Sequence, residues 1–298
     1  MKRLLLICLF SMAIHSFAQT GTDIILFDLK KEDNQWVLSN GRNITKHKGY
    51  DNQPFFHPLQ PLIYFTSSDD TARIDSSEIK TYHYGTHQTA VFTKTRDREY
   101  SPTVTPDAQF ISCILQRKNG DQDLVKYPIA GGRPEVLINH LKVGYHAWAG
   151  DDRLFLFVLE DSAHFSLHHY YLGKNADTVV AENIGRSLHR IPGQNAMCFV
   201  QRITDKLSVI KRYDLATGLI SNIVYTIPGQ DHLTWLQDGT ILMSDGKKIF
   251  YHQYTSSQEL KDKQWTPLVV KGDSSFLKNI TRLAVSSDNT KLAMVVGE

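Results

Sequence analysis

Residues 100–112 read YSPTVTPDAQFIS, and this stretch decides how the rest of the chain is interpreted. Apolar and polar residues alternate before Pro106, and an apolar run begins soon after Asp107. Proline and aspartate supply the backbone dihedrals and the side-chain hydrogen bond that a tight turn needs. The stretch therefore predicts a β-hairpin with its corner at Pro106-Asp107.

The hairpin pattern recurs along the chain. The segment YDNQPFFHPLQPLIYF at 50–65 places Pro54 on Pro102 and Pro58 on Pro106, at an offset of 48 residues. Weaker copies begin at His146, Leu188, Leu233 and Leu283. Successive copies start 48, 44, 42, 45 and 50 residues apart. Repeats of this length are typical of blade-type units, each built from a few short strands.

A second type of strand lies between the hairpins. Its segments alternate apolar and polar residues, which predicts strands with one exposed face. These segments are 24–29, 79–84, 123–128, 165–172, 207–215 and 248–254. A further strand follows them, as at 131–138 and 218–227, whereas the second strand of each hairpin is a nearly continuous apolar run. Each unit is therefore expected to contain four strands.

The two ends of the chain hold incomplete units. The strand pair at 24–45 lacks a preceding hairpin, and the hairpin at 283–296 lacks a following pair. Together they would form one four-stranded unit. The sequence therefore predicts an all-β, six-bladed β-propeller with four-stranded blades, in which strands from the N- and C-terminal ends share the closing blade.

The first residues have the features of a secretory signal peptide. Two basic residues precede an apolar run at 4–14, and Ala18 provides the small residue expected at a cleavage site. We expect cleavage after Ala18, a periplasmic or secreted protein, and one propeller domain over 19–298. A buried helix and a lipid-modified Cys8 are the alternatives, although only four apolar residues would precede that cysteine.

Charge and cysteine content narrow the possible functions. Without residues 1–18 the chain has 31 basic and 31 acidic residues, which leaves no electrostatic footprint for nucleic acid or an anionic membrane. No second apolar run could span a bilayer, so we expect no transmembrane segment in the mature chain. Cys113 and Cys198 lie in apolar runs of different repeats. We expect two buried free thiols, although an exported protein could also join them.

The repeats resemble the TolB-type, WD40-like (PD40) propeller family. The stretches QPFFHPL at 53–59 and SPTVTPDAQFI at 101–111 are most similar to its repeat, while WLQDGTIL at 235–242 and VSSDNTKLAMV at 285–295 match its turn half. The resemblance implies a propeller fold. Relatives are periplasmic protein-interaction modules, peptidase propeller domains and carbohydrate-associated exported proteins. TolB itself has an additional N-terminal α/β domain, which we expect to be missing here.

Familiar catalytic motifs are absent from the sequence, including a G-x-S-x-G nucleophile elbow, H-E-x-x-H and a P-loop. His146, His189 and His232 lie at or beside the starts of three successive innermost strands, where three imidazoles could bind a metal. The three histidines occupy repeat positions that differ by one residue from copy to copy, so they need not face inward together. The alternative to a metal site is that they are loop histidines that hydrogen-bond to the backbone. Asp51 and Asp231 could share a cation, as in metal-dependent lactonase propellers, but two acids form an incomplete ligand set.

Other residue types near these strand starts have simpler explanations. The acids Asp107, Asp151, Asp238 and Asp288 occupy turns, where they cap the backbone. The aromatic residues Phe56, Trp148 and Trp235 share one repeat position and are expected in the core. Tyrosines that precede the strands suit a binding rim, because they offer contact area at low entropic cost.

The sequence thus favours a non-catalytic module that binds a protein, peptide or glycan at the mouth of the propeller channel. The expected rim residues are Tyr50, Asp51, Tyr100, Ser101, Tyr145, His146, His189, Asp231 and His232. No cofactor is expected, apart from a possible divalent cation. The alternative is a metal-dependent hydrolase or lyase of the lactonase or oligosaccharide-processing type, with its site at the same mouth.

Overall fold

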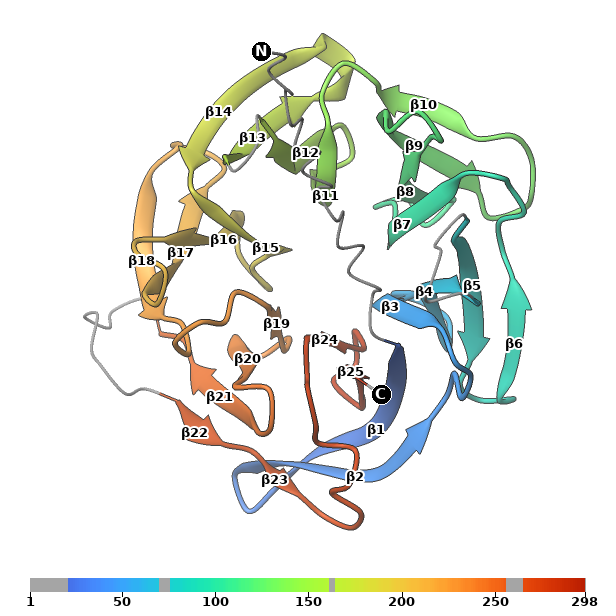
Figure 1. Ribbon diagram of the computed structural model, residues 1–298. Helices are drawn as coiled ribbons and strands as arrows, with labels where there is room; N and C mark the ends of the chain where they lie inside the picture. Colours follow the sequence, from blue (N-terminus) through green and yellow to red (C-terminus); the bar gives the residue numbers. More distant parts are fainter. Residues whose placement is uncertain (1–20, 70–75, 161–163, 256–264, 298) are drawn as a thin grey trace, which may run out of the picture.

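A computed structural model describes residues 21–69, 76–160, 164–255 and 265–297, which form an almost entirely β structure. The sheets are arranged around a common centre (Figure 1). Within the described ranges the one helical element is the short 3-10 turn η1 (Leu172–Lys174). No helix there is long and apolar enough to cross a membrane.

Four sheets are four-stranded antiparallel meanders, each made from one continuous stretch of chain. The first contains β7 (Arg98–Val104), β8 (Phe110–Gln116), β9 (Gln122–Pro128) and β10 (Glu135–Ile138). The second contains β11 (Val143–Gly150), β12 (Arg153–Leu159), β13 (Phe165–Tyr171) and β14 (Ala176–Glu182). The third contains β15 (Ile184–Arg190), β16 (Ala196–Arg202), β17 (Ser208–Asp214) and β18 (Ile220–Tyr225). The fourth contains β19 (Leu233–Trp235), β20 (Thr240–Ser244), β21 (Ile249–Gln253) and β22 (Thr266–Pro267).

The remaining strands form one nine-stranded sheet that includes both ends of the described chain. One half contains β3 (Tyr50–Phe56), β4 (Leu62–Ser68), β5 (Glu78–His83) and β6 (Gln88–Val91). The other half contains β1 (Thr22–Glu32), β2 (Gln35–Asn43), β23 (Val269–Val270), β24 (Arg282–Val285) and β25 (Lys291–Gly297). Strand β25 pairs antiparallel with β1, from Thr22 opposite Gly297 to Asp28 opposite Lys291. The first and last strands therefore lie side by side.

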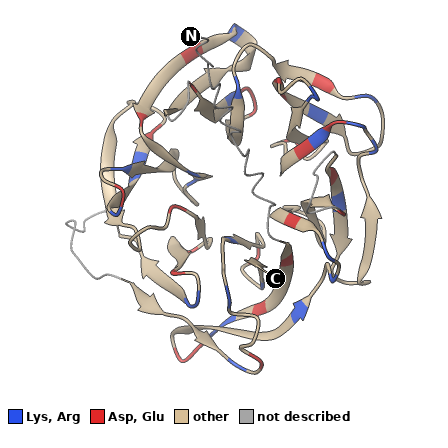
Figure 2. Ribbon diagram, in the orientation of Figure 1, with Lys and Arg blue, Asp and Glu red and all other residues tan. Residues whose placement is uncertain are grey.

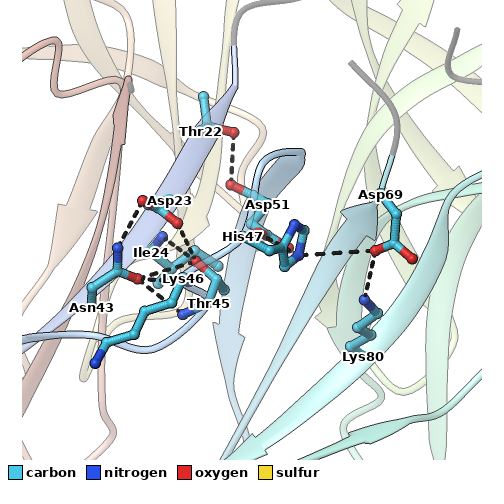
Figure 3. Close-up of polar contacts among 10 residues, drawn as sticks. All are labelled: Thr22, Asp23, Ile24, Asn43, Thr45, Lys46, His47, Asp51, Asp69 and Lys80. Carbon is cyan, nitrogen blue, oxygen red and sulfur yellow. Dashed lines mark hydrogen bonds and ion pairs between the residues drawn. The ribbon is translucent and has the colours of Figure 1, made fainter. Parts of the chain in front are cut away.

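The two halves of this sheet meet at the start of β1. A single parallel pair, Thr22 opposite Tyr50, joins β1 to β3. Thr22 Oγ1 donates to the carbonyl oxygen of Asp51 at 2.9 Å (Figure 3). Next to it, the Asp23 carboxylate accepts hydrogen bonds from Asn43 Nδ2 at 2.7 Å and Thr45 Oγ1 at 2.9 Å. These contacts fix where β1 begins and hold the segment after β2 against it.

The hairpin corner predicted at Pro106-Asp107 is confirmed in atomic detail. Ala108 N donates to Thr105 O at 2.8 Å, and the Asp107 carboxylate accepts from Gln109 N at 3.0 Å. Ala108 has a φ of 55°, in the left-handed region. Asp288, at the β24–β25 corner, likewise accepts from Thr290 N at 3.0 Å. In both corners the acid stabilises its own turn, as the sequence indicated.

Hydrophobic clusters lie between neighbouring sheets. The cluster between the β3–β6 half and the β7–β10 sheet includes Tyr64, Ile79, Ile111 and Cys113, all at most 2% exposed. Equivalent clusters occupy the other junctions between neighbouring sheets, and one more lies between the two halves of the nine-stranded sheet. The second strand of each hairpin is buried on both faces, which explains its apolar sequence. Cys113 and Cys198 are free, buried thiols in separate clusters, as expected.

Removal of residues 22–45 deletes β1 and β2 and leaves β25 paired with β24 alone. We expect the melting temperature to fall by on the order of 10 °C or more, because several kcal/mol of packing and pairing are lost. A chain that lacks only residues 1–18 is the control. An unchanged thermal melt would contradict the structural role assigned to the β1–β25 pairing.

A single substitution tests the same junction without a deletion. Phe27 is 1% exposed and packs edge-on against Phe276, with ring centroids 6.5 Å apart. We expect Phe27→Ala to lower the free energy of unfolding by about 3–5 kcal/mol through loss of buried surface and an unfilled cavity. Leu59, which is 80% exposed, provides the matched control, and Leu59→Ala should leave the urea unfolding midpoint unchanged.

Candidate functional site: the central cavity

The centre of the ring contains a cavity of about 580 Å³. Its lining comes from the innermost strands β3, β7, β11, β15, β19 and β24 and from the turns that follow them. A cavity of this volume lies within the range of small-molecule sites. Charged residues of both signs are distributed around the ring, with no side of it dominated by one sign (Figure 2).

Five of the nine predicted rim residues line this cavity. They are Ser101, Tyr145, His146, His189 and His232. The other four, Tyr50, Asp51, Tyr100 and Asp231, are not part of the lining. In β3 and β7 the lining begins only at Gln53 and Ser101, three residues after each strand starts. In these two strands the residues nearer the start are outside the lining, whereas the lining includes His232, just before β19, and Arg282, the first residue of β24.

Matching β-bulges form this end of the cavity. The β3–β4 register shifts between Asn52 and Phe55, and the β7–β8 register shifts between Tyr100 and Thr103. Within these bulges Gln53 and Ser101 have φ values of 56° and 55°, which are uncommon for residues other than glycine. Bulges often re-aim side chains near functional sites. Gln53 and Ser101 are 48 residues apart, so the two repeats share this left-handed backbone conformation as well as their hydropathy pattern.

Gln53 links the two bulged strands. Its Oε1 accepts a hydrogen bond from Ser101 N at 2.9 Å and another from Thr66 Oγ1 at 2.7 Å. A side-chain carbonyl of one sheet thereby satisfies a backbone donor of the next, at the edge of the cavity. The bond to Ser101 connects β3 with β7, and it uses the backbone of Ser101 and not its hydroxyl.

An arginine–tyrosine pair joins β24 and β11, the innermost strands that flank β3 and β7 on either side. Arg282 Nη2 donates to Tyr145 Oη at 2.8 Å, and the guanidinium carbon lies 5.0 Å from the centroid of the Tyr145 ring. Burial opposes ionisation of Tyr145, but the charges of Arg282 and Arg186 outweigh it and lower the pKa of the phenol. Of the predicted tyrosines, Tyr145 alone combines cavity exposure with a charged partner.

The three cavity histidines are neutral near pH 7. Burial lowers the pKa of His146 to about 3, that of His189 to about 4 and that of His232 to about 3. His146 Nε2 lies 2.7 Å from Ser112 Oγ, which also accepts from Trp148 Nε1 at 2.9 Å. Phe56, Trp148 and Trp235 all border the cavity. Phe56 and Trp235 are buried, as expected of core residues, whereas Trp148 is half-buried.

The two acids proposed to share a cation each have another partner. The Asp231 carboxylate forms an ion pair with Arg202, and His232 Nε2 lies 3.7 Å from Asp231 Oδ1. Asp51 is fully buried, and its Oδ2 lies 3.0 Å from His47 Nε2 (Figure 3). Among the described residues, no group of three or more histidines, cysteines and acids is arranged to hold a metal ion.

Buried carboxyl groups occupy equivalent positions just before the two bulges. Asp51 and Glu99 are related by the repeat offset, and both are 0% exposed. Burial raises the pKa of Asp51 to about 6 and that of Glu99 to about 7. Glu99 Oε1 accepts from Thr95 Oγ1 at 2.6 Å and from Tyr127 Oη at 3.1 Å. Both acids are buried groups with partners inside the protein, and neither is part of the cavity lining.

A serine–histidine–aspartate row lies outside the cavity, on β13 and β14. His168 Nε2 lies 2.7 Å from Ser166 Oγ, and His168 Nδ1 lies 2.8 Å from Asp177 Oδ2. This order resembles the triad of serine hydrolases. However, Ser166 is only 4% exposed and its hydroxyl donates to the carboxylate of Glu160. A second carboxylate beside the nucleophile would oppose a developing oxyanion, so the row is better explained as a structural ion-pair network.

Comparisons with known proteins support the fold. No protein-family model matches the chain, and no curated protein matches its sequence. Among solved structures, a putative TolB from Agrobacterium tumefaciens has a TM-score of 0.69 and 11% identity, with 94% of this chain and 99% of that chain covered. The chain has a TolB-like β-propeller fold.

Two further structures have the same fold. TolB from Acinetobacter baumannii has a TM-score of 0.57 and 11% identity over 93% of this chain, which spans 65% of the length of that protein. An oligogalacturonate lyase in complex with manganese has a TM-score of 0.53 and 13% identity, with 94% and 98% of the two chains covered. At these identities, the similarity describes the fold alone.

Several polar residues of the lining were not predicted from the sequence, among them Arg282, Arg186 and Gln53. Arg282 directly precedes the repeat copy at Leu283, and Arg186 lies two residues before the copy at Leu188. Gln53 precedes Pro54 in the most recognisable repeat. A comparison of the residues just ahead of each copy would have found the two arginines. The role of Gln53 depends on the bulge, for which the sequence carries no separate signal.

The buried Glu99 carboxyl predicts a pH dependence of stability. Between its unfolded pKa of 4.5 and its folded pKa of about 7, the folded state holds a proton that the unfolded state has lost. The free energy of unfolding should therefore fall as the pH rises through this window, by up to about 3 kcal/mol. Glu99→Gln should remove this decrease, which urea titrations at about pH 5 and about pH 8 would measure.

The control for this measurement is Glu135→Gln, because the Glu135 side chain is 63% exposed. It should retain the pH dependence of the wild type. Asp51 contributes a separate decrease at lower pH, so some slope should remain in Glu99→Gln. Identical slopes in Glu99→Gln and the wild type would disprove the assignment.

Proposed function

We propose that this protein is an exported six-bladed propeller whose central cavity binds a peptide, a protein segment or a glycan without catalysis. The observation that carries the proposal is the convergence of polar and aromatic side chains from all of the innermost strands on one cavity. Concave sites with a few convergent polar groups are the usual location of ligand binding. Tyr145, Trp148 and the neutral histidines supply contact area together with hydrogen-bonding groups.

The blade count rests on how the nine-stranded sheet is divided. Its halves are joined through one residue pair, Thr22 with Tyr50, whereas β24, β25, β1 and β2 are paired along their lengths. Counting each half as a blade gives six blades, with both chain ends contributing to one of them. This division also assigns one innermost strand to each blade, and it supports a central binding site reached by every blade.

The test is a comparison of two tyrosines. Residues 19–298 would be screened against peptide and glycan arrays, and the bound ligand would be titrated by calorimetry. We expect Tyr145→Ala to weaken binding about tenfold or more, because aromatic side chains at the centre of a site contribute most of the binding energy. Tyr171→Ala, in β13 outside the cavity lining, should bind like the wild type.

Two outcomes would contradict a binding function for the cavity. One is that the wild type retains no array ligand. The other is that Tyr145→Ala and Tyr171→Ala bind the ligand as well as the wild type does, which would place the site elsewhere on the molecule. Circular dichroism of both variants would establish that each one is folded.

A second candidate function is metal-dependent hydrolysis or elimination at the same cavity. It is favoured by the three neutral imidazoles in the lining, since a metal ligand must be unprotonated, and by the manganese in the similarly folded lyase structure. It is disfavoured because the described histidines and acids do not form a group of three that could hold a metal. Metal analysis of protein purified without chelator separates the candidates: stoichiometric metal that is lost in His189→Ala and His232→Ala would favour the enzyme.

Export is the remaining part of the proposal, and it falls on residues outside the described ranges. Expression of the full sequence in a Gram-negative host should give a periplasmic protein whose mass corresponds to residues 19–298, because the apolar run is followed by a small residue at position 18. Substitution of the residue at the cleavage site, Ala18→Arg, should block processing. Intact-mass spectrometry of the periplasmic and cytoplasmic fractions measures both effects.

A further inference from the structure

Two guanidinium groups in the cavity lack a carboxylate partner. Arg282 hydrogen-bonds to the hydroxyl of Tyr145, and Arg186 forms no hydrogen bond or ion pair with any residue that the structure describes. Arg186 is exposed and Arg282 is half-buried. Both act on the same neighbours, since both lower the pKa of Tyr145 and of His232. The two positive charges therefore lie close to the same part of the cavity.

The surrounding groups do not neutralise this charge. The cavity histidines are uncharged near pH 7, as described above. Asp231 interacts electrostatically with Arg186, but its carboxylate forms an ion pair with Arg202, and both Asp231 and Arg202 are outside the lining. The third lining arginine, Arg190, donates to the carbonyl of Ala149 at 2.8 Å. Asp151, in the β11–β12 turn, is the one acid in the lining. The lining as a whole carries a net positive charge.

We propose that Arg186 and Arg282 bind the carboxylate of a small, hydroxylated organic acid in the central cavity. The proposal rests on the proposed ligand-binding function and names the chemical class of the ligand. Guanidinium groups match the geometry of a carboxylate and form two parallel hydrogen bonds with it. Arg282 uses one of its five N–H donors on Tyr145, so the others remain available to a ligand.

The rest of the lining suits hydroxyl groups. A neutral imidazole presents one donor and one acceptor, which is the pairing a hydroxyl needs. His189 and His232 lie in the lining close enough to each other to interact electrostatically. The apolar lining residues Leu233 and Trp235 are nearly buried, and Trp235 Nε1 already donates to Cys198 Sγ at 3.0 Å. The imidazole and guanidinium groups thus supply polar contacts for a ligand, while proline, aromatic and aliphatic side chains make up much of the rest of the lining.

The experiment is calorimetric titration of residues 19–298 with four probes: sodium D-glucuronate, D-glucose, inorganic phosphate and a blocked aspartyl dipeptide. Glucuronate differs from glucose by its carboxylate, so this comparison isolates the charge. We expect glucuronate to bind at least about tenfold more tightly than glucose, as charge-assisted hydrogen bonds to a carboxylate require. Its affinity should fall as the salt concentration rises.

The variants are Arg186→Gln and Arg282→Gln, with Arg133→Gln as the matched control. Each cavity variant should weaken glucuronate binding about tenfold or more, while Arg133, an exposed residue outside the lining, should be replaceable without effect. Arg282→Lys should retain part of the affinity, since it keeps the charge and loses the planar pair of donors. It also keeps the test decisive if Arg282→Gln does not fold.

Several results would overturn the proposal. Equal affinities for glucuronate and glucose, or unchanged glucuronate binding in both glutamine variants, would show that the arginines do not recognise a carboxylate. Tighter binding of the aspartyl dipeptide or of phosphate than of glucuronate would show that the cavity recognises a different class of anion. If glucuronate fails to bind but Tyr145→Ala still weakens binding of an array ligand, the cavity is a binding site and the proposed organic-acid ligand is wrong. If no array ligand binds either, both proposals fail.

Discussion

The antiparallel pairing of β1 with β25 is the interaction on which the rest of the structure depends. It joins segments from opposite ends of the described chain, so its formation must overcome a large loop-closure entropy. Alternate residue pairs between Thr22–Gly297 and Asp28–Lys291 exchange backbone hydrogen bonds, and the buried side chains on both strands add apolar area. Without this pairing, β24 would lose its place at the centre, and Arg282 would lose its position beside Tyr145.

Much of the fold could be predicted because each repeat carries two independent signals, a turn with a defined residue type and an apolar strand after it. The corner at Asp107 and the one at Asp288 were predicted in this way. The short strand β23 was not, since Val269 and Val270 pair with β2 from outside the repeat pattern. Strand β13 was expected to be half exposed, yet its residues from Ser166 to Tyr170 are all buried, because His168 and His169 each find partners within the structure.

Less of the candidate site could be predicted, because the side chains that line the cavity depend on backbone irregularities. The bulges at Gln53 and Ser101 change which residues face the centre. The sequence analysis treated Tyr50 and Tyr100 as equivalent rim residues. In the structure Tyr100, paired with Ile114, directly precedes its bulge, whereas Tyr50, paired with Ser68, lies two residues further from its own bulge. Hydropathy also cannot distinguish an arginine that is paired, such as Arg202, from one that is not, such as Arg186.

The position of the two ends has a practical consequence. Thr22 and Gly297 are directly opposite each other, so a short linker could join them and convert the chain into a covalent circle. New ends could then be opened at an exposed loop such as 131–134, in which Gly131 and Gly132 have positive φ values. In such a circular permutant, β24, β25, β1 and β2 would follow one another along the chain. The long-range contact would become a local one, and folding would no longer wait for the two ends of the chain to meet.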